Sequence, residues 1–169
     1  MELLVIRHGA AMDKEEFAKT GKSDDLRPLT SAGMEEMKEI ARGLQELVKK
    51  IDLLATSPLV RAVQTAEIVG AAYDAPVSET TASLSPDAEP EEFEKWCADF
   101  EDVKRIAVVG HEPHLTTLVT WLVTGEEDAV IELKKGGACL LEFDAGIKRG
   151  SGILNWLMTP GQLTRIQSS

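Results

Sequence analysis

Arginine and histidine side chains stand directly after three short apolar runs of the sequence. Arg7 and His8 follow the first run, Arg61 comes shortly after the second, and His111 comes shortly after the third. A guanidinium is a planar fork of N–H donors that fits a phosphate or a carboxylate, and an imidazole can donate, accept or attack. Two guanidiniums and two imidazoles in one crevice would form a cationic cluster of donors, which suits a phosphoryl group.

The three apolar runs predict buried strands of a parallel sheet. They cover residues 3–6, 53–55 and 106–109, and short continuous apolar runs are typical of such strands. The carboxyl ends of parallel strands meet at one edge of the sheet, where ligands of open α/β sheets bind. We therefore expect the two arginines and two histidines to converge there, with Arg27 joining them from the loop after the first strand.

Helical patterns separate these strands. An N-cap at Thr30 or Ser31 precedes apolar residues at helical spacing, which predicts a helix of about 17 residues. Further helices are predicted over 59–73, over 91–100, and after Pro113, a residue favoured in the first turn. The sequence therefore alternates strands and helices.

Two last apolar runs, 139–143 and 153–158, are joined by a glycine-rich turn and predict an antiparallel strand pair. The fold class that follows is α/β, a three-layer sandwich with a mostly parallel central sheet that ends in the antiparallel pair. At this length we expect residues 1–169 to form a single domain.

The overall charge is acidic, with 18 Lys and Arg against 29 Asp and Glu, a formal net charge of −11. No basic run could neutralise a phosphate backbone or an anionic bilayer, so neither nucleic acid nor a membrane is an expected partner. The opening apolar run is too short for a signal peptide, and no run approaches a spanning helix. Cys97 and Cys139 lack a C-x-x-C spacing, which favours reduced thiols. We expect a cytoplasmic monomer.

Zinc is the rival use for three histidines, His8, His111 and His114. The neighbouring arginines would repel a dication, and the run His-Glu-Pro-His at 111–114 lacks the H-E-x-x-H spacing. We expect no metal and no other cofactor, and we expect His114 to face solvent from the first turn of its helix.

Four ordered blocks of the sequence resemble the histidine phosphatase superfamily, whose fold is phosphoglycerate-mutase-like. The blocks are Arg7-His8-Gly9, Arg27-Pro28-Leu29-Thr30 with Gly33, Ser57-Pro58-Leu59-Val60-Arg61-Ala62 with Gln64-Thr65-Ala66, and Val109-Gly110-His111-Glu112-Pro113. The last three blocks narrow the resemblance to the SixA branch, whose members are small bacterial phosphohistidine phosphatases. The closing segment 155–160 is also similar, so the resemblance spans nearly the whole chain.

The resemblance implies a metal-independent phosphatase that forms a covalent intermediate. His8 would be the nucleophile and would carry a transient phosphoryl group. Arg7 and Arg61 would hold the phosphoryl oxygens, and His111 would complete the pocket, with Arg27 as a further phosphate-binding residue. Phosphoryl transfer needs positioning and charge neutralisation more than covalent help, which agrees with this set.

The leaving group distinguishes the possible substrates. Mutases and phosphomonoesterases of this fold typically offer a glutamate that protonates the leaving alkoxide. No carboxylate in 84–90 aligns with that acid, and we expect Asp87 and Glu89 to be solvated, although a general-acid role for either stays open. Imidazole can leave as a neutral ring, so a phosphohistidine-bearing protein is the favoured substrate. The alternatives are a broad-specificity phosphomonoesterase acting on small phosphorylated metabolites and a non-catalytic phosphate-binding module.

Overall fold

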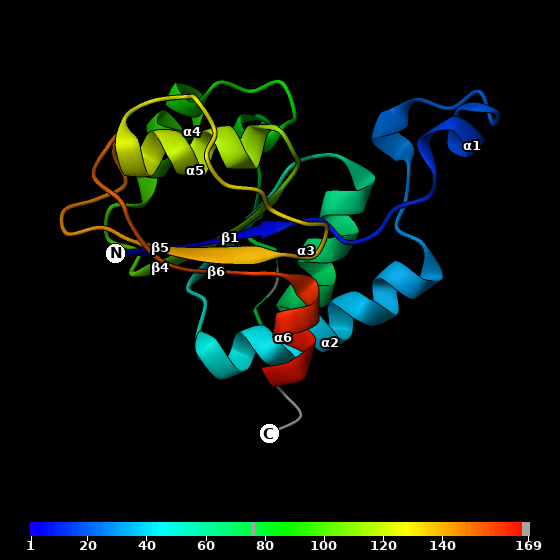
Figure 1. Cartoon of the computed structure of the whole chain (residues 1–169), viewed down its shortest axis with the longest axis horizontal. Helices are drawn as coiled ribbons and strands as arrows, with labels where there is room; N and C mark the ends of the chain where they lie inside the picture. The colour runs from blue at the N-terminus through cyan, green and yellow to red at the C-terminus, as the bar shows by residue number, and fades with distance from the viewer. Residues whose placement is uncertain (76, 167–169) are drawn as a thin grey trace.

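The computed structural model describes residues 1–75 and 77–166. Within them, a six-stranded sheet has the order β3-β2-β4-β1-β5-β6 (Figure 1). The strands are β1 (Glu2–Arg7), β2 (Leu53–Thr56), β3 (Glu79–Thr80), β4 (Arg105–Gly110), β5 (Ala138–Glu142) and β6 (Ile153–Met158). The helices are α1 (Lys14–Ala18), α2 (Ser31–Leu47), α3 (Val60–Ala72), α4 (Pro90–Cys97), α5 (His114–Thr124) and α6 (Pro160–Ile166), with single 3-10 turns η1 (Asp24–Leu26), η2 (Ala82–Leu84) and η3 (Ala98–Phe100).

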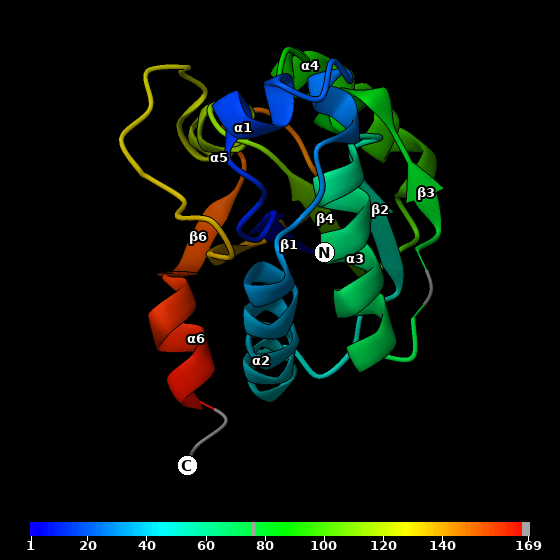
Figure 2. The same cartoon turned by 90° about the vertical axis from the view of Figure 1, so that its right-hand side faces the viewer.

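The sheet is mostly parallel and ends in an antiparallel pair, as predicted. β1, β2, β3 and β4 run parallel, β5 runs antiparallel to β1, and β6 runs antiparallel to β5. Figure 2 shows the strands side by side from β6 at one edge to β3 at the other. β1 lies in the middle, where Val5 pairs with Val108 on one side and Cys139 on the other.

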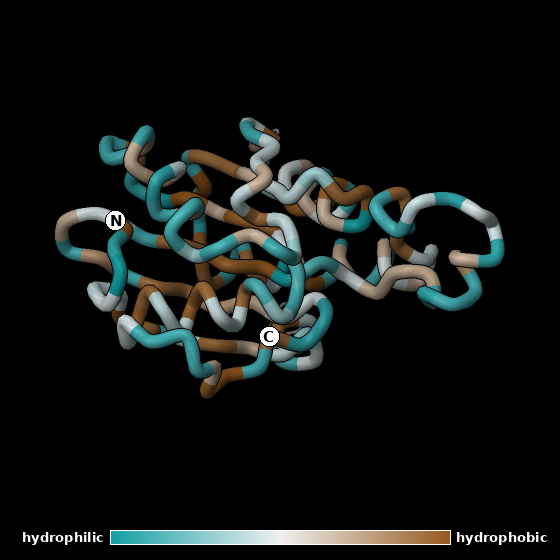
Figure 3. The backbone as a smooth tube through the Cα atoms, turned by 90° about the horizontal axis from the view of Figure 1, so that it is seen from above, coloured by the Kyte–Doolittle hydropathy of each residue, from teal (hydrophilic) through white to brown (hydrophobic). Residues whose placement is uncertain are grey.

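Helices cover both faces of this sheet, which confirms the three layers. Leu3 and Val5 point to one face, where they pack with α4 and α5, and Leu4 and Ile6 point to the other, where they pack with α2, α3 and α6. Figure 1 shows the two helical layers above and below the strands. The alternation follows from the period of two in a strand. Figure 3 shows the hydrophobic segments gathered in the interior and hydrophilic segments in the outlying loops.

The predicted 17-residue helix is α2, and its N-cap is Thr30. The hydroxyl of Thr30 accepts the backbone N–H of Gly33 at 2.9 Å, which satisfies a donor that the helix itself leaves free. In the described part of the chain, no helix is long and apolar enough to cross a membrane.

Two elements lie outside the predicted pattern. β3 has two residues, too few to show periodicity, and α6 begins at Pro160, beyond the last predicted strand. α6 packs closely on α2. The two helices are so near that a side-chain carbon added at Gly43 would collide with the backbone oxygen of Leu163. The two cysteines, Cys97 and Cys139, are free and buried, and burial raises the pKa of both thiols.

Candidate active site

Of the predicted site residues, Arg7 and His8 stand at the carboxyl end of β1 and His111 follows β4, whereas Arg61 lies in the first turn of α3, after β2. Arg7 and Gly110 end β1 and β4 and are partners in the ladder between these strands. The backbone N–H of His8 donates to the carbonyl oxygen of Gly110 at 3.1 Å, so the parallel pairing continues past the last strand residue. The chain after β2 is held likewise, since the N–H of Ser57 donates to Val109 at 3.0 Å. In Figure 1 this edge of the sheet faces the segment that carries α1.

The structure brings His8 and His111 together. Their ring centroids lie 5.0 Å apart with an interplanar angle of 53°, and both side chains are buried. The two residues are far apart in the sequence, so the sheet creates this contact. The structure therefore places the two histidine rings next to each other, as predicted.

The hydrogen bond of His8 determines which ring nitrogen is free. Nδ1 lies 2.7 Å from the carbonyl oxygen of Gly9. A carbonyl only accepts, so Nδ1 carries the proton and Nε2 of the neutral ring keeps its lone pair. Burial lowers the pKa of His8 to about 4, and the charges of Arg61, Arg7 and Lys135 add to this effect while the bond to Gly9 opposes it. At neutral pH His8 is therefore an uncharged imidazole with Nε2 available.

His111 is held by a hydroxyl group. Its Nε2 lies 2.7 Å from Oγ of Ser57, and its Nδ1 is buried with no hydrogen-bond partner among the described residues. Burial lowers the pKa of His111 to about 3, and the positive charges nearby act in the same direction. His111 is thus a second neutral imidazole beside the first.

The two predicted arginines, Arg7 and Arg61, are each held through the Nη atoms of the guanidinium. Nη1 of Arg7 donates to the carbonyl oxygen of Leu133 at 2.7 Å. Arg61 contacts Asp24 through Nη1, 3.1 Å from its backbone oxygen, and through Nη2, 3.3 Å from Oδ2. The Nε atoms of Arg7 and Arg61 are buried and lack partners within the described chain. Buried N–H groups almost always have a partner, so these two donors are exceptions that an acceptor such as a phosphoryl oxygen would satisfy.

Arg27 lies near Arg61, but its Nε and Nη1 already have hydrogen-bond partners. Nε of Arg27 donates to Oδ1 of Asp24 at 2.7 Å, and Nη1 donates to the backbone oxygen of Met12 at 2.8 Å. The charge of Arg27 helps to lower the pKa of Arg61, after burial. Direct contact between Arg27 and a phosphoryl group stays a prediction.

Sequence reasoning missed the residues that orient these groups. Asp24 binds both arginines of its neighbourhood, but it lies in a charged segment with no periodicity. Thr65 lies in one of the family blocks without an assigned role. Its hydroxyl accepts the N–H of Gly9 at 3.1 Å and donates to the carbonyl oxygen of Arg61 at 2.8 Å, so it ties the loop after β1 to α3.

The loop 133–137 completes the surroundings of His8. The N–H of Gly136 lies 3.2 Å from the carbonyl oxygen of Arg7 and 3.1 Å from that of His8. Gly136 has a φ of +75°, a conformation that glycine adopts without strain. Lys135, the residue before it, is exposed and has no ion pair in the described chain. This loop therefore places a cation without an ion pair in the described chain near the His8 ring.

The prediction that His114 faces solvent is wrong. His114 is 3% exposed, because α5 is buried on most sides at its first turn. Burial lowers the pKa of His114 to about 4, and the charge of Asp87 opposes this shift. Asp87 and Glu89 are themselves exposed, as expected.

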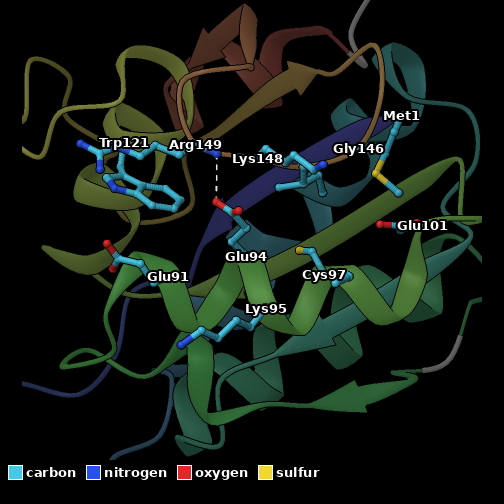
Figure 4. Close-up of a pocket in the computed structure, with 12 residues that line it drawn as sticks. Met1, Glu91, Glu94, Lys95, Cys97, Glu101, Trp121, Gly146, Lys148 and Arg149 are labelled. Carbon is cyan, nitrogen blue, oxygen red and sulfur yellow. Dashed lines mark hydrogen bonds between the residues drawn. The ribbon is translucent and has the colours of Figure 1, made fainter.

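Other parts of the described chain offer less chemistry. No three His, Cys, Asp or Glu side chains within it are grouped to hold a metal ion. A cavity of about 410 Å³ lies at the opposite end of the sheet, near Met1 (Figure 4). There Glu94 accepts the backbone N–H of Arg149 at 2.9 Å, and the guanidinium of Arg149 lies 5.8 Å from the ring of Trp121. None of the predicted site residues line this cavity.

Known proteins share both the sequence and the architecture. The sequence model of the histidine phosphatase superfamily (branch 1) matches residues 3–83. Phosphohistidine phosphatase SixA of Escherichia coli (strain K12) is 30% identical over 96% of each chain. A solved structure of the protein histidine phosphatase SixA complexed with tungstate is 28% identical, with a TM-score of 0.82, and the match covers 96% of this chain and 99% of that one.

A more distant likeness extends to another phosphatase. The alpha-ribazole phosphatase of Shigella flexneri is 19% identical, with a TM-score of 0.74, and the match covers 95% of this chain and 97% of that one. At this identity the likeness shows the fold alone. Together the structural matches confirm the predicted phosphoglycerate-mutase-like α/β fold.

Proposed function

The chain belongs to the histidine phosphatase superfamily, and from that premise we propose that it is a phosphohistidine phosphatase acting on phosphorylated proteins. The observation that carries the proposal is a neutral His8 with Nε2 available, near the buried guanidinium of Arg61 and the half-buried guanidinium of Arg7. The name of the E. coli relative supports the substrate class. Tungstate, the ligand of the SixA structure, is a tetrahedral oxyanion like phosphate.

In the first step, Nε2 of His8 attacks phosphorus in line with the leaving imidazole. A bond forms between His8 and phosphorus while the bond to the substrate imidazole breaks. The substrate ring leaves neutral because its other nitrogen already carries a proton. The carbonyl of Gly9 stabilises the positive charge that develops on the His8 ring. Arg7 and Arg61 neutralise the equatorial oxygens, which is the main contribution a protein makes to this reaction.

In the second step, water attacks the phosphoryl group on His8. The bond between phosphorus and Nε2 breaks, and its electron pair returns to the ring. The water protons stay with the phosphate product, so His8 regains its starting form. Splitting hydrolysis into two transfers is the usual advantage of a covalent intermediate.

Neither step needs a metal ion or a separate acid. The guanidiniums of Arg7 and Arg61 supply the positive charge, and a neutral imidazole leaves without a proton donor. Asp87 and Glu89 are exposed in the loop before α4, which agrees with a P–N bond as the scissile bond. The expectations of a monomer and of a cytoplasmic location stay predictions.

A substrate panel tests the proposal. Turnover of a phosphohistidine protein is compared with turnover of common phosphomonoesters, with and without a chelator. We expect preferred hydrolysis of phosphohistidine that survives chelation, and phosphate trapped on the protein after rapid quenching. His8→Ala should lose both turnover and trapping. Unchanged turnover in His8→Ala would refute the mechanism.

Two other results would each favour an alternative. High turnover on small phosphomonoesters that disappears in Asp87→Asn or Glu89→Gln would indicate a broad-specificity phosphomonoesterase. Tight phosphate binding without turnover of any phosphoramidate would indicate a binding module.

A further inference from the structure

The hydroxyl group of Ser57 is the only hydrogen-bond partner of the His111 ring in the described chain. Oγ of Ser57 lies 2.7 Å from Nε2 of His111. Ser57 is fully buried, and it follows β2 at the same edge of the sheet as the two histidines. Either atom could be the donor in this bond, so the proton must be located from the other contacts.

A second contact of Ser57 shows which atom carries the proton of the bond between Ser57 and His111. The backbone N–H of Leu59 donates to Oγ of Ser57 at 3.3 Å, which uses one lone pair of the hydroxyl. The hydroxyl proton still needs an acceptor, and within the described residues the acceptor in reach is Nε2 of His111. Ser57 therefore donates, and Nε2 accepts.

The direction of this bond decides the chemistry of the other ring nitrogen. Burial holds the pKa of His111 near 3, so the ring is neutral and carries one proton. If Nε2 accepts, that proton is on Nδ1, which then becomes a buried N–H donor without a partner. The opposite tautomer would leave the Ser57 proton without an acceptor. It would also leave Nδ1 of His111 as a buried lone pair without a donor in the described chain.

A phosphoryl group has only acceptor oxygens, so the two tautomers differ in their effect on it. An Nδ1–H beside His8 can donate to a phosphoryl oxygen, whereas a bare Nδ1 would repel it. Donors fixed before the reaction stabilise charge without further reorganisation, and buried donors do so more strongly than donors in water.

We propose that Ser57 is a positioning residue that holds His111 in the Nδ1–H tautomer, so that this nitrogen donates to the transferring phosphoryl group. The proposal rests on the proposed phosphatase function and assigns to Ser57 a task beyond shaping the loop. Ser57 does not touch the substrate and acts through His111.

Proton–nitrogen correlation spectra of the histidine rings test the tautomer without any turnover. In the wild-type protein we expect the His111 proton on Nδ1, and we expect this signal to shift when inorganic phosphate is added. In Ser57→Ala the preference should be lost. A wild-type ring protonated on Nε2 would overturn the proposal. Because this readout needs no substrate, it stays separate from a failure of the proposed function.

Kinetics of the same variants supply the second readout. In Ser57→Ala we expect kcat to fall roughly tenfold, less than the roughly 100-fold loss typical when a whole donor is removed. KM should change little, because the arginines remain. Ser57→Thr keeps the hydroxyl and should recover kcat if it folds. Unchanged kcat in Ser57→Ala would contradict the proposal.

Thr56→Val is the matched control. Thr56 is as buried as Ser57, and its hydroxyl bonds to the carbonyl oxygen of Ser57 at 3.0 Å. Valine removes that hydroxyl at nearly constant volume without touching either histidine. The His111 spectrum and kcat should stay at their wild-type values. An equal loss in this variant would show that the Ser57 effect is general disturbance of the loop, which would also overturn the proposal.

Discussion

Asp24 holds the guanidinium of Arg61 with its backbone oxygen at 3.1 Å and its carboxylate at 3.3 Å. The side chain of Arg61 is 6% exposed and that of Asp24 is 40% exposed, so the carboxylate lies between the guanidinium and solvent. The two contacts restrain the far end of the guanidinium, while Nε remains a free buried donor. Asp24 therefore orients the guanidinium of Arg61 without occupying all its donors.

Asp24→Ala should lower kcat/KM for phosphohistidine. Arg61 would lose its counter-charge and one of its two restraints, and misplacement of a positioning group by about 1 Å can cost up to about 100-fold in rate. We expect a loss of between about tenfold and 100-fold. Asp25→Ala is the control, since Asp25 is an exposed neighbour without a hydrogen bond to Arg61 in the described chain. Equal losses in both variants would mean that only the net charge matters.

The activity should persist to unusually low pH. In the proposed mechanism His8 attacks as a neutral ring, and burial, together with Arg61 and Arg7, lowers its pKa to about 4. The acid limb of kcat/KM for the free enzyme should therefore lie near pH 4, well below the ordinary histidine value of about 6.5. The measurement is a pH profile with non-enzymatic hydrolysis subtracted. An acid limb at about pH 6.5 would contradict the prediction that burial keeps His8 neutral at lower pH.

Folding stability should fall on acidification, and His114 should contribute to the fall. Its pKa of about 4 in the folded chain lies below the unfolded value of about 6.5, so the unfolded state binds more protons between these values. Stability is therefore lost as the pH drops through this window, by about 2 kcal/mol at pH 5 for this one group. His114→Leu should flatten the pH dependence of urea unfolding. An unchanged slope would show that His114 does not titrate as a buried group.

Lys135 should strengthen substrate binding more than it accelerates the chemistry. It is exposed near His8 and unpaired within the described residues, whereas Lys134 is paired with Glu132 at 2.6 Å. Lys135→Ala should raise KM for a phosphoryl substrate by roughly threefold to tenfold at low salt, with a smaller effect at high salt. Lys134→Ala is the matched control and should leave KM unchanged. A large fall in kcat for Lys135→Ala would contradict a role limited to attraction.

Gly43→Ala should destabilise the fold. The added carbon would collide with the backbone oxygen of Leu163, so α2 and α6 would have to separate. Overpacking of this kind costs about 1–3 kcal/mol. Gly161→Ala is the control, since a carbon there meets nothing within 4 Å. Urea unfolding of both variants measures the difference, and equal stabilities would show that α6 can move away without cost.

The sequence predicted the structure best where a local pattern of residues also determines their place in the fold. Buried parallel strands are short apolar runs, so the ends of β1 and β4 could be located and the meeting of His8 with His111 expected. The N-cap of α2 could be narrowed to Thr30 or Ser31 because capping is a local hydrogen bond, and the structure places it at Thr30. The three-layer arrangement followed from the alternation of these elements.

Contacts between distant polar residues left no comparable pattern. Asp24 and Arg61 are 37 residues apart, and nothing in the charged loop distinguishes Asp24 from its neighbours. The burial of His114 was missed because a polar residue in a first turn is normally solvated, whereas here the turn packs inside the protein. α6 has a single buried residue, Leu163, which is too little for a periodic pattern.

The central position of β1 has a consequence for synthesis on the ribosome. β1 is made before both of its neighbours, β4 and β5, which begin at residues 105 and 138. The carbonyl of Leu133, which holds Arg7, is also made late. A nascent chain therefore exposes β1 unpaired until β4 has emerged, and open strand edges favour aggregation at that stage. His8 is translated before β4 and before the loop 133–137, so the pocket around its ring can form only after both segments have emerged.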